Sequence, residues 1–343
     1  MTATGMRCAL ATFHPATPER LRFTRQLGLD DGILWGPTLP ADVASLDHKA
    51  LLAVRCAFEG EGLRLFAIET LPASFMQDII LAGPKRDEHV DVLRRLVRDM
   101  SRAGIGVLGY NWMVDGVWRT STSHSLRGGA RGTVSVAADL ARAPIGHGRV
   151  FSEDELWASY TYFLNAVVPV AEEEGVRLAL HPNDAPVPSV AGVPALFSTR
   201  AAFERGLSLV DNPANALCLC LGNWGAIGEK IPDVVRDLGP RGKIVYVHFQ
   251  AVQDNIPEHG RFNECFVDEA DNDALDIVLA LHEVGFDGVM IPGHVPQMEG
   301  DDEWRTAVSA ASTPYTHPMG GHRARAYTIG YLRGLVKAVE RLA

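Results

Sequence analysis

Short apolar runs recur along this 343-residue chain, with amphipathic segments between them. The runs that we predict to be β-strands are residues 8–12, 32–35, 63–68, 106–110, 176–181, 216–221, 244–249 and 288–291. Such runs are typical of strands that are buried on both faces, and their alternation with helices is typical of a parallel sheet. Because eight such units occur, we expect an α/β protein whose strands close into a (β/α)8 TIM barrel with extended βα loops at its C-terminal face.

Helical periodicity predicts the segments that connect these strands. The clearest helices are residues 87–103, 152–175, 199–210, 231–238, 274–284 and, at the end of the chain, 327–342. The second of these begins with Ser152, and Glu155 follows three residues later, which is the pattern of a capping box.

We expect one TIM-barrel domain over residues 1–343, with loop insertions near 120–151 and 299–325. The first insertion is rich in Gly, Ser, Arg and Ala. Long loops of this kind are typically active-site lids, subunit contacts or disordered segments. Both insertions follow predicted strand ends, so we expect them at the face of the barrel where active sites are found.

The composition excludes several kinds of partner. The formal net charge is −10 and no long block of Lys or Arg occurs, so nucleic acid is not an expected partner. No apolar run approaches the roughly 20 residues that span a bilayer, so a membrane is not expected either. The five cysteines are scattered and odd in number, which argues for a reducing compartment. We therefore expect a cytoplasmic protein that acts on a small-molecule substrate and forms a homo-oligomer.

Histidine and cysteine side chains lie at or just after the ends of four consecutive predicted strands. They are His181, Cys218 and Cys220, His248, and His294. Imidazole and thiolate groups that converge at a barrel mouth are typical of a divalent-metal site with an open position for substrate. Cys218 and Cys220 share one face of their strand, and Cys220 is the preferred ligand because it lies nearer the strand end.

Each of these residues also has a simpler interpretation. A single histidine at a strand end is more often a hydrogen-bonded structural residue than a metal ligand. A buried cysteine usually packs as a small hydrophobic side chain. The occurrence of such residues on four strands in a row favours the metal site.

Other polar and aromatic side chains follow the same set of strands and are candidates for substrate binding. These candidates are Glu69, Asn111, Trp112, Arg119, Asn183, Asp184 and Asn223. An arginine can hold a carboxylate through two parallel hydrogen bonds, so Arg119 would suit an acid substrate. The alternatives are packing beneath a loop for Trp112 and a solvated surface charge for Arg119.

The usual motifs of nucleotide-binding proteins and serine hydrolases do not occur in their expected contexts. Neither GxxxxGK(S/T) nor GxGxxG marks a phosphate-binding loop, and no GxSxG marks a nucleophilic serine. Nucleotide-dependent chemistry and serine-hydrolase chemistry therefore lose support.

The stretch at residues 168–186, which reads VPVAEEEGVRLALHPNDAP, resembles the mannonate dehydratase family. Shorter segments resemble that family in the same order along almost the whole chain. They are residues 68–72, 104–113, 220–223, 247–249, 254–255, 262–264, 271–273, 294–298 and 329–335. The resemblance implies a TIM barrel of the xylose-isomerase type, a bound Mn²⁺ and elimination of water from an aldonic acid in carbohydrate metabolism. Zn²⁺, Fe²⁺ and Co²⁺ are alternative ions.

The resemblance also assigns metal ligands. Three of the family's ligands fall on His181, Cys220 and His248, which are the residues that the strand ends indicate. The fourth ligand of the family is an Asp, and this chain has Gly293 in its place.

The family's acid/base residues are replaced as well. Its second motif His falls on Pro296, and its Tyr falls on Ala326. Further departures from the family pattern lie at Asn183, Ala185 and Ile291. The residues that we expect to take over catalysis are His294, Tyr327 and Tyr315. Other possible replacements are His259, His317 and His322.

We therefore expect a divalent-metal-dependent lyase of the dehydratase type that acts on a small hydroxy acid or sugar acid through an enediolate-type intermediate. The replaced acid/base residues predict a reaction other than ordinary mannonate dehydration. One alternative is a metal-dependent sugar isomerase, epimerase or aldol-type lyase on the same barrel. Another is a barrel without catalysis that binds a sugar acid.

Overall fold

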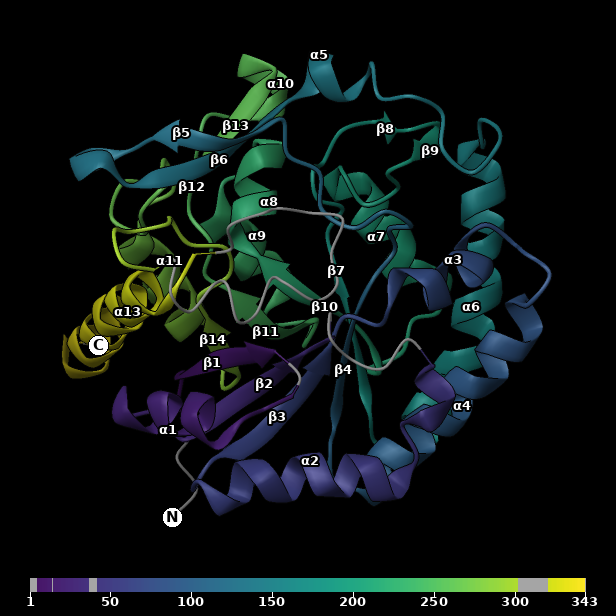
Figure 1. Cartoon of the computed structure of the whole chain (residues 1–343), viewed down its shortest axis with the longest axis horizontal. Coiled ribbons are helices and arrows are strands. Elements are labelled where there is room, and N and C mark those ends of the chain that lie inside the picture. Colours follow the sequence, from purple (N-terminus) through teal and green to yellow (C-terminus); the bar gives the residue numbers. More distant parts are fainter. Residues whose placement is uncertain (1–4, 14, 37–41, 302–319, 343) are drawn as a thin grey trace.

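The structure is a computed structural model that describes residues 5–13, 15–36, 42–301 and 320–342. Eight parallel strands form a closed barrel, in the hydrogen-bonded order β1-β14-β11-β10-β7-β4-β3-β2 (Figure 1). Their bounds are β1 (Arg7–Phe13), β2 (Asp31–Trp35), β3 (Arg64–Glu69), β4 (Val107–Asn111), β7 (Arg177–His181), β10 (Asn215–Cys220), β11 (Ile244–His248) and β14 (Val289–Ile291). The eight predicted strands and the TIM barrel are therefore confirmed.

The interior of the barrel is built from residues that alternate along each strand. One buried cluster contains a small or branched residue from every barrel strand, including Ala9, Ile33, Ala67, Val107, Ala179, Ala216, Cys218, Val245 and Val289. Strand β11 is an exception to the alternation, because Tyr246, next to Val245, belongs to the same cluster. The intervening residues, such as Leu178 and Leu180, belong to the larger cluster that the helices cover. Because side chains alternate with a period of two, His181 shares the inward face of Ala179, and Cys220 shares that of Cys218.

Helices surround the barrel (Figure 1). The longer ones are α1 (Pro18–Gln26), α2 (His48–Gly60), α3 (Ala73–Ile80), α4 (Arg86–Arg102), α6 (Glu153–Glu173), α7 (Arg200–Leu209), α9 (Ile231–Leu238), α11 (Ala274–Glu283) and α13 (His322–Leu342). Shorter helices are α5 (Ala137–Leu140), α8 (Leu221–Ile227) and α10 (Ile256–His259), with 3₁₀ turns η2 (Val43–Ser45) and η3 (Arg127–Gly129). No helix in these described ranges is long and apolar enough to cross a membrane.

Five of the six predicted helices are confirmed to within two residues at each end. The closing helix α13 begins at His322, five residues before the predicted start. Its first turns bury Arg325 and Thr328 beside Ala324. Because these inward-facing residues are polar, the spacing of apolar residues does not indicate the start of this helix.

The first predicted insertion, residues 120–151, forms β-structure and a short helix. Strands β5 (Ser121–Ser125) and β6 (Arg131–Val136) form a hairpin, β6 pairs with β13 (Arg261–Glu264), and β13 pairs with β12 (Val252–Gln253), which completes a four-stranded antiparallel sheet. Figure 1 shows β5 and β6 extending beyond the barrel beside β13. A further two-stranded sheet joins β8 (Ser189–Val190) and β9 (Val193–Pro194).

The sequence of this insertion does not show the apolar alternation of an ordinary half-buried strand. Strand β5 reads STSHS, and its residues are exposed or half-buried. Strand β6 buries Gly132, Thr133, Val134 and Ser135, of which only Val134 is apolar. Most of the second predicted insertion, with Tyr315 and His317, lies outside the described residues.

Candidate metal centre

Three adjacent barrel strands bring His181, Cys220 and His248 together. These residues end β7, β10 and β11, and Cys220 is paired with His248 in the parallel register. Their ligand atoms all lie within 4.8 Å of one another, and all three side chains are buried. An imidazole, a thiol and a second imidazole in this arrangement match the donor set of a divalent transition-metal site.

A second group of possible ligands overlaps the first. Glu69, Cys218 and His248 also have donor atoms within 4.8 Å of one another. Glu69 Oε2 accepts a hydrogen bond from Trp35 Nε1 at 2.7 Å and lies 3.0 Å from His248 Nε2. Carboxylates commonly orient metal-binding histidines in this way, so Glu69 is placed to fix the orientation of the His248 ring.

Burial sets the protonation of the central residues. Burial, followed by the nearby His248, lowers the pKa of His181 to about 4. The His181 ring is therefore neutral at neutral pH, and its Nδ1 lies 2.8 Å from the carbonyl oxygen of Pro182. If Nδ1 donates to this carbonyl, Nε2 carries the lone pair that a metal ion requires. Burial raises the pKa of the Cys220 thiol, so a bound ion would have to displace its proton.

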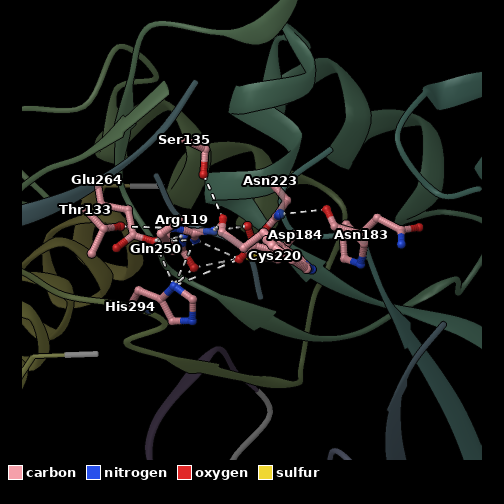
Figure 2. Close-up of polar contacts among 12 residues, drawn as sticks. Arg119, Thr133, Ser135, Asn183, Asp184, Cys220, Asn223, Gln250, Glu264 and His294 are labelled. Atoms are coloured by element: carbon pink, nitrogen blue, oxygen red, sulfur yellow. Dashed lines mark hydrogen bonds and ion pairs between the residues drawn. The ribbon is translucent and has the colours of Figure 1, made fainter. Parts of the chain in front are cut away.

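A buried charged cluster lies beside the metal centre, with Arg119 at its middle (Figure 2). Arg119 donates to both carboxylate oxygens of Asp184, at 2.5 and 2.8 Å, and to Glu264 Oε1 at 2.5 Å. His294 Nδ1 lies 2.7 Å from the same Glu264 oxygen and 3.2 Å from Arg119 Nη2. The structure therefore joins Arg119 and Asp184, both predicted to bind substrate, in one ion pair.

The ion pair controls the charge of Asp184. Burial by itself raises the pKa of this carboxyl, but the Arg119 guanidinium outweighs burial and holds the pKa below its ordinary value. Asp184 therefore stays ionised. The guanidinium fork of Arg119 is directed at protein carboxylates, and its side chain is only 2% exposed.

The two asparagines predicted to bind substrate form hydrogen bonds within the protein. Asn183 Oδ1 accepts from the backbone N–H of Phe197 at 2.7 Å, and its Nδ2 donates to the carbonyl of Trp112. Asn223 Nδ2 donates to the carbonyl of Asn183 at 2.9 Å, and its Oδ1 lies 2.9 Å from Cys220 Sγ. This chain of amides holds the loop after β7 against helix α8, which follows β10 directly.

The other predicted site residues, Asn111, Trp112 and Tyr327, each have a different environment. Asn111 ends β4 beside His181, and its buried Oδ1 has no hydrogen-bond partner among the described residues. Trp112 is buried against the rings of Tyr160 and Phe163. Tyr327 is 37% exposed at the start of α13, where its hydroxyl accepts a hydrogen bond from Arg127.

Two residues of the site were missed by the sequence analysis. Gln250 lies two residues beyond His248 and donates from Nε2 to Glu264 Oε1 at 3.1 Å. Glu264 ends β13, in a segment that entered the sequence analysis only through the family resemblance. No local pattern marks either residue, because both reach the site through the sheet and loop that follow β11.

A wide cavity of about 840 Å³ lies at the opposite end of the barrel. It is lined by residues that precede or begin β7, β10 and β11, including Arg177, Asp211 and Lys243. It is therefore separate from the metal centre, which is formed by the other ends of the same strands.

A closed parallel barrel with buried His, Cys and His at its C-terminal mouth defines a TIM-barrel protein with a candidate metal site. Residues 6–138 and 138–343 match the family model described as D-mannonate dehydratase (UxuA). The chain belongs to the mannonate dehydratase family, whose members are metal-dependent hydro-lyases. The predicted family and the predicted hydro-lyase class are both confirmed.

Individual relatives agree with this membership. The chain is 26% identical to mannonate dehydratase 2 of Halalkalibacterium halodurans, over 98% of this chain and 100% of the relative. It is 25% identical to the mannonate dehydratase of Thermotoga maritima, over 86% of each.

Solved structures support the fold. The mannonate dehydratase of Streptococcus suis superposes with a TM-score of 0.83 at 24% identity, covering 98% of this chain and 94% of that one. A xylose isomerase domain protein of Planctomyces limnophilus superposes with a TM-score of 0.62 at 12% identity, over 98% and 99% of the two chains.

Proposed function

We propose that this protein is a dehydratase that removes water from a sugar acid and depends on a divalent ion held by His181, Cys220 and His248. The observation that carries the proposal is the convergence of these three buried donor atoms within 4.8 Å at the C-terminal mouth of the barrel. Mn²⁺ is the first ion to test, with Zn²⁺, Fe²⁺ and Co²⁺ as alternatives. Because the relatives are mannonate dehydratases, D-mannonate is the first substrate to test.

The donor set fits such an ion. Two imidazoles and a thiolate suit divalent transition metals, and the buried Glu69 beside His248 supplies the carboxylate that commonly orients a ligand ring. When bound, the ion would act as a Lewis acid that stabilises negative charge on the substrate as the proton next to the carboxylate leaves.

His294 is the residue that we propose for proton transfer. Its Nδ1 lies nearer to Glu264 Oε1, at 2.7 Å, than to Arg119 Nη2, at 3.2 Å. The shorter contact favours the tautomer in which Nδ1 donates to the Glu264 carboxylate, because Arg119 directs its own N–H groups at the carboxylates of Asp184 and Glu264. Nε2 is then the basic nitrogen, which can accept a proton from the substrate or return one to the departing hydroxyl.

We further propose that the substrate or the proton path differs from that of ordinary mannonate dehydration. The positions of the family's fourth ligand and acid/base residues are occupied by Gly293, Pro296 and Ala326. A site with one buried acid/base histidine in place of the family's set would favour a different aldonic acid, or a different order of proton transfers.

The test is a product analysis of metal-loaded protein with a panel of aldonic acids that includes D-mannonate. We expect at least one acid to give a product that has lost one water, detected by mass spectrometry. A product of unchanged mass would favour the isomerase alternative and contradict dehydration. Binding without turnover across the panel would favour the barrel without catalysis.

Two variants separate the proposed roles. The His294→Asn variant should retain its metal and lose about 10²–10⁴-fold in kcat, because it removes the acid/base group. The His181→Ala variant should lose metal and activity together. Full activity of the His294→Asn variant would contradict the role given to His294.

A further inference from the structure

Gln250 lies between the metal centre and the charged cluster. It follows β11 two residues after His248, and its side chain is 4% exposed. Its Oε1 is 3.6 Å from Cys220 Sγ, while its Nε2 donates to Glu264 Oε1 at 3.1 Å. Figure 2 shows Gln250 among these residues. One amide therefore contacts the proposed thiolate ligand at one end and a carboxylate at the other.

Two glycines make room for this amide. A Cβ added to Gly222 would lie 2.6 Å from Gln250 Cγ, and a Cβ added to Gly293 would lie 2.9 Å from Gln250 Cβ and 3.1 Å from Oε1. The same Cβ at Gly293 would lie 3.4 Å from His248 Cβ. The Gln250 side chain therefore fills the space between two strand ends, and a larger residue at either glycine would displace it.

The hydrogen bond between Gln250 and Glu264 determines the orientation of the Gln250 amide. Because a carboxylate can only accept, the nitrogen faces Glu264 and the oxygen faces Cys220. Asn223 is oriented in the same manner, since its Nδ2 donates to the carbonyl of Asn183 and its Oδ1 lies 2.9 Å from Cys220 Sγ. Two amide oxygens are thus directed at one sulfur atom.

This arrangement leaves one lone pair of the Gln250 oxygen, the one directed at Cys220 Sγ, without a donor. A thiol carries a single proton, so it can donate one hydrogen bond, and the closer Asn223 oxygen is the better acceptor. One lone pair of the Gln250 oxygen accepts a long hydrogen bond, 3.4 Å, from the backbone N–H of His294, and its other lone pair then faces the sulfur as one acceptor facing another. A cation between the two atoms would turn both of them into ligands.

The separation of the two atoms agrees with that interpretation. With sulfur about 2.3 Å and oxygen about 2.1 Å from an ion, and an angle of about 110° between the two bonds, sulfur and oxygen are about 3.6 Å apart. This is the distance between Cys220 Sγ and Gln250 Oε1. We propose that Gln250 Oε1 is a fourth protein ligand of the ion held by His181, Cys220 and His248.

The consequence is a centre with one anionic ligand, the Cys220 thiolate, and three neutral ones. A divalent ion in this set keeps a net positive charge, which favours an anionic substrate such as a carboxylate at a fifth coordination position. The inference rests on the proposed metal centre. It goes beyond that centre by assigning Gln250 as a ligand. It also explains why positions 222 and 293 are glycine, because a side chain at either position would meet Gln250.

The first test uses Co²⁺-loaded protein, because the visible absorption of Co²⁺ changes with the number and kind of its ligands. We expect the Gln250→Leu variant to bind Co²⁺ about 10–100-fold more weakly than the unchanged protein, measured by chelator competition, and to have an altered spectrum. The matched control is Gln253→Leu, since the Gln253 side chain donates to the Glu269 carbonyl away from the site. It should bind Co²⁺ as the unchanged protein does.

Two variants test whether glycine at position 293 is needed to leave space for the Gln250 side chain. Gly293→Asp alone should weaken Co²⁺ binding, because the new side chain meets Gln250. Gly293→Asp combined with Gln250→Ala should recover at least part of the affinity, because the aspartate then has the space next to the ion. Independent, additive losses in the pair would contradict the shared position.

The decisive measurement needs no variant and therefore does not depend on the folding of one. A crystal structure of the unchanged protein loaded with Co²⁺ should place Gln250 Oε1 about 2.0–2.3 Å from the ion. An ion held by His181, Cys220 and His248 with Gln250 Oε1 beyond bonding distance would overturn the assignment of Gln250 alone. Failure of the unchanged protein to bind any ion would overturn the metal centre itself.

Discussion

Arg119 shows how much of this site depends on single buried charges. Its guanidinium lies between the carboxylates of Asp184 and Glu264, and all three side chains are at most 2% exposed. Removing a charge from water costs several kcal/mol unless a partner compensates it. The cluster is therefore stable only as a complete set, in contrast to the ion pairs on the surface of the molecule.

Replacing Arg119 with methionine should destabilise the protein strongly, because two buried carboxylates would lose their common partner. We expect the free energy of unfolding to fall by about 3–5 kcal/mol, measured by urea denaturation. The matched control is Arg142→Met, which breaks an exposed pair with Asp139 and should change stability by less than about 1 kcal/mol. Similar losses of unfolding free energy in Arg119→Met and Arg142→Met would contradict the claim that burial makes the Arg119 ion pairs important for stability.

The cysteines should differ sharply in reactivity, because the thiolate is the reactive form. Cys56 is exposed. Burial raises the pKa of Cys8 to about 12, and it raises the pKa values of Cys218, Cys220 and Cys265 as well.

Native protein at neutral pH should therefore show a single fast thiol in a titration with Ellman's reagent. The Cys56→Ser variant should lack this fast phase, while urea should release all remaining thiols in both proteins. A fast phase that persists after Cys56→Ser would show that a buried thiol is more accessible than the structure indicates.

At the scale of elements, helix α6 illustrates how local sequence determines where a helix begins. Ser152 caps its first turn, and Glu155 accepts hydrogen bonds from the backbone and the side chain of Ser152. Arg149 adds a hydrogen bond to the same carboxylate. Three residues thus stabilise the first turn of α6 through local hydrogen bonds, and this is why the capping box was predictable from sequence.

The carboxylate of Glu155 should give the protein a measurable pH dependence. The hydrogen bond from Arg149, followed by those from Ser152, lowers the pKa of Glu155 from 4.5 to about 2. Between these values the unfolded chain binds the proton and the folded chain does not, so stability falls as the pH drops through this window. The contribution is complete above about pH 4.5 and absent below about pH 2.

The Glu155→Gln variant should therefore be less stable than the unchanged protein at pH 7, and the difference should shrink at pH 3. Urea midpoints at several pH values would measure it. Glu153→Gln, in the same helical turn, is the control and should leave the acid limb of the profile unchanged. If Glu155→Gln were less stable than the unchanged protein by the same amount at pH 7 and at pH 3, Glu155 would not be the source of the pH dependence.

At the scale of the whole molecule, the strands were predictable because a closed parallel barrel imposes a simple pattern. Buried strands read as apolar runs, and the period of two places His181, Cys220 and His248 on the inward face at one end of the barrel. The β5–β6 hairpin was not predictable, because the strand that β6 pairs with, β13, lies more than a hundred residues away. Its own sequence shows no apolar alternation.

The same limit applies to the rest of the site. Gln250 and Glu264 reach the metal centre only because the chain after β11 folds back against β6. The environment of Gln250 also depends on Gly222 and Gly293, which are separated by about seventy residues in sequence and flank one side chain in the fold. Such contacts follow from the packing of several elements and not from any local pattern.

The metal centre joins three strands, so an ion bound there should stabilise the barrel as a whole. At a free-ion concentration 100-fold above the dissociation constant, binding should add about 2.7 kcal/mol to the free energy of unfolding. This increase in unfolding free energy should vanish in a variant in which His181, Cys220 or His248 is replaced.

The central claim is that His181, Cys220 and His248 hold one divalent ion, and elemental analysis after equilibrium dialysis against Mn²⁺, Zn²⁺ or Co²⁺ tests it most directly. We predict a single ion per chain in the unchanged protein and in Cys8→Ser, which removes a cysteine far from these ligands in the sequence. His181→Ala, Cys220→Ser and His248→Ala should each lose the ion. Unchanged protein that retains no ion, or ligand variants that retain it fully, would contradict the account.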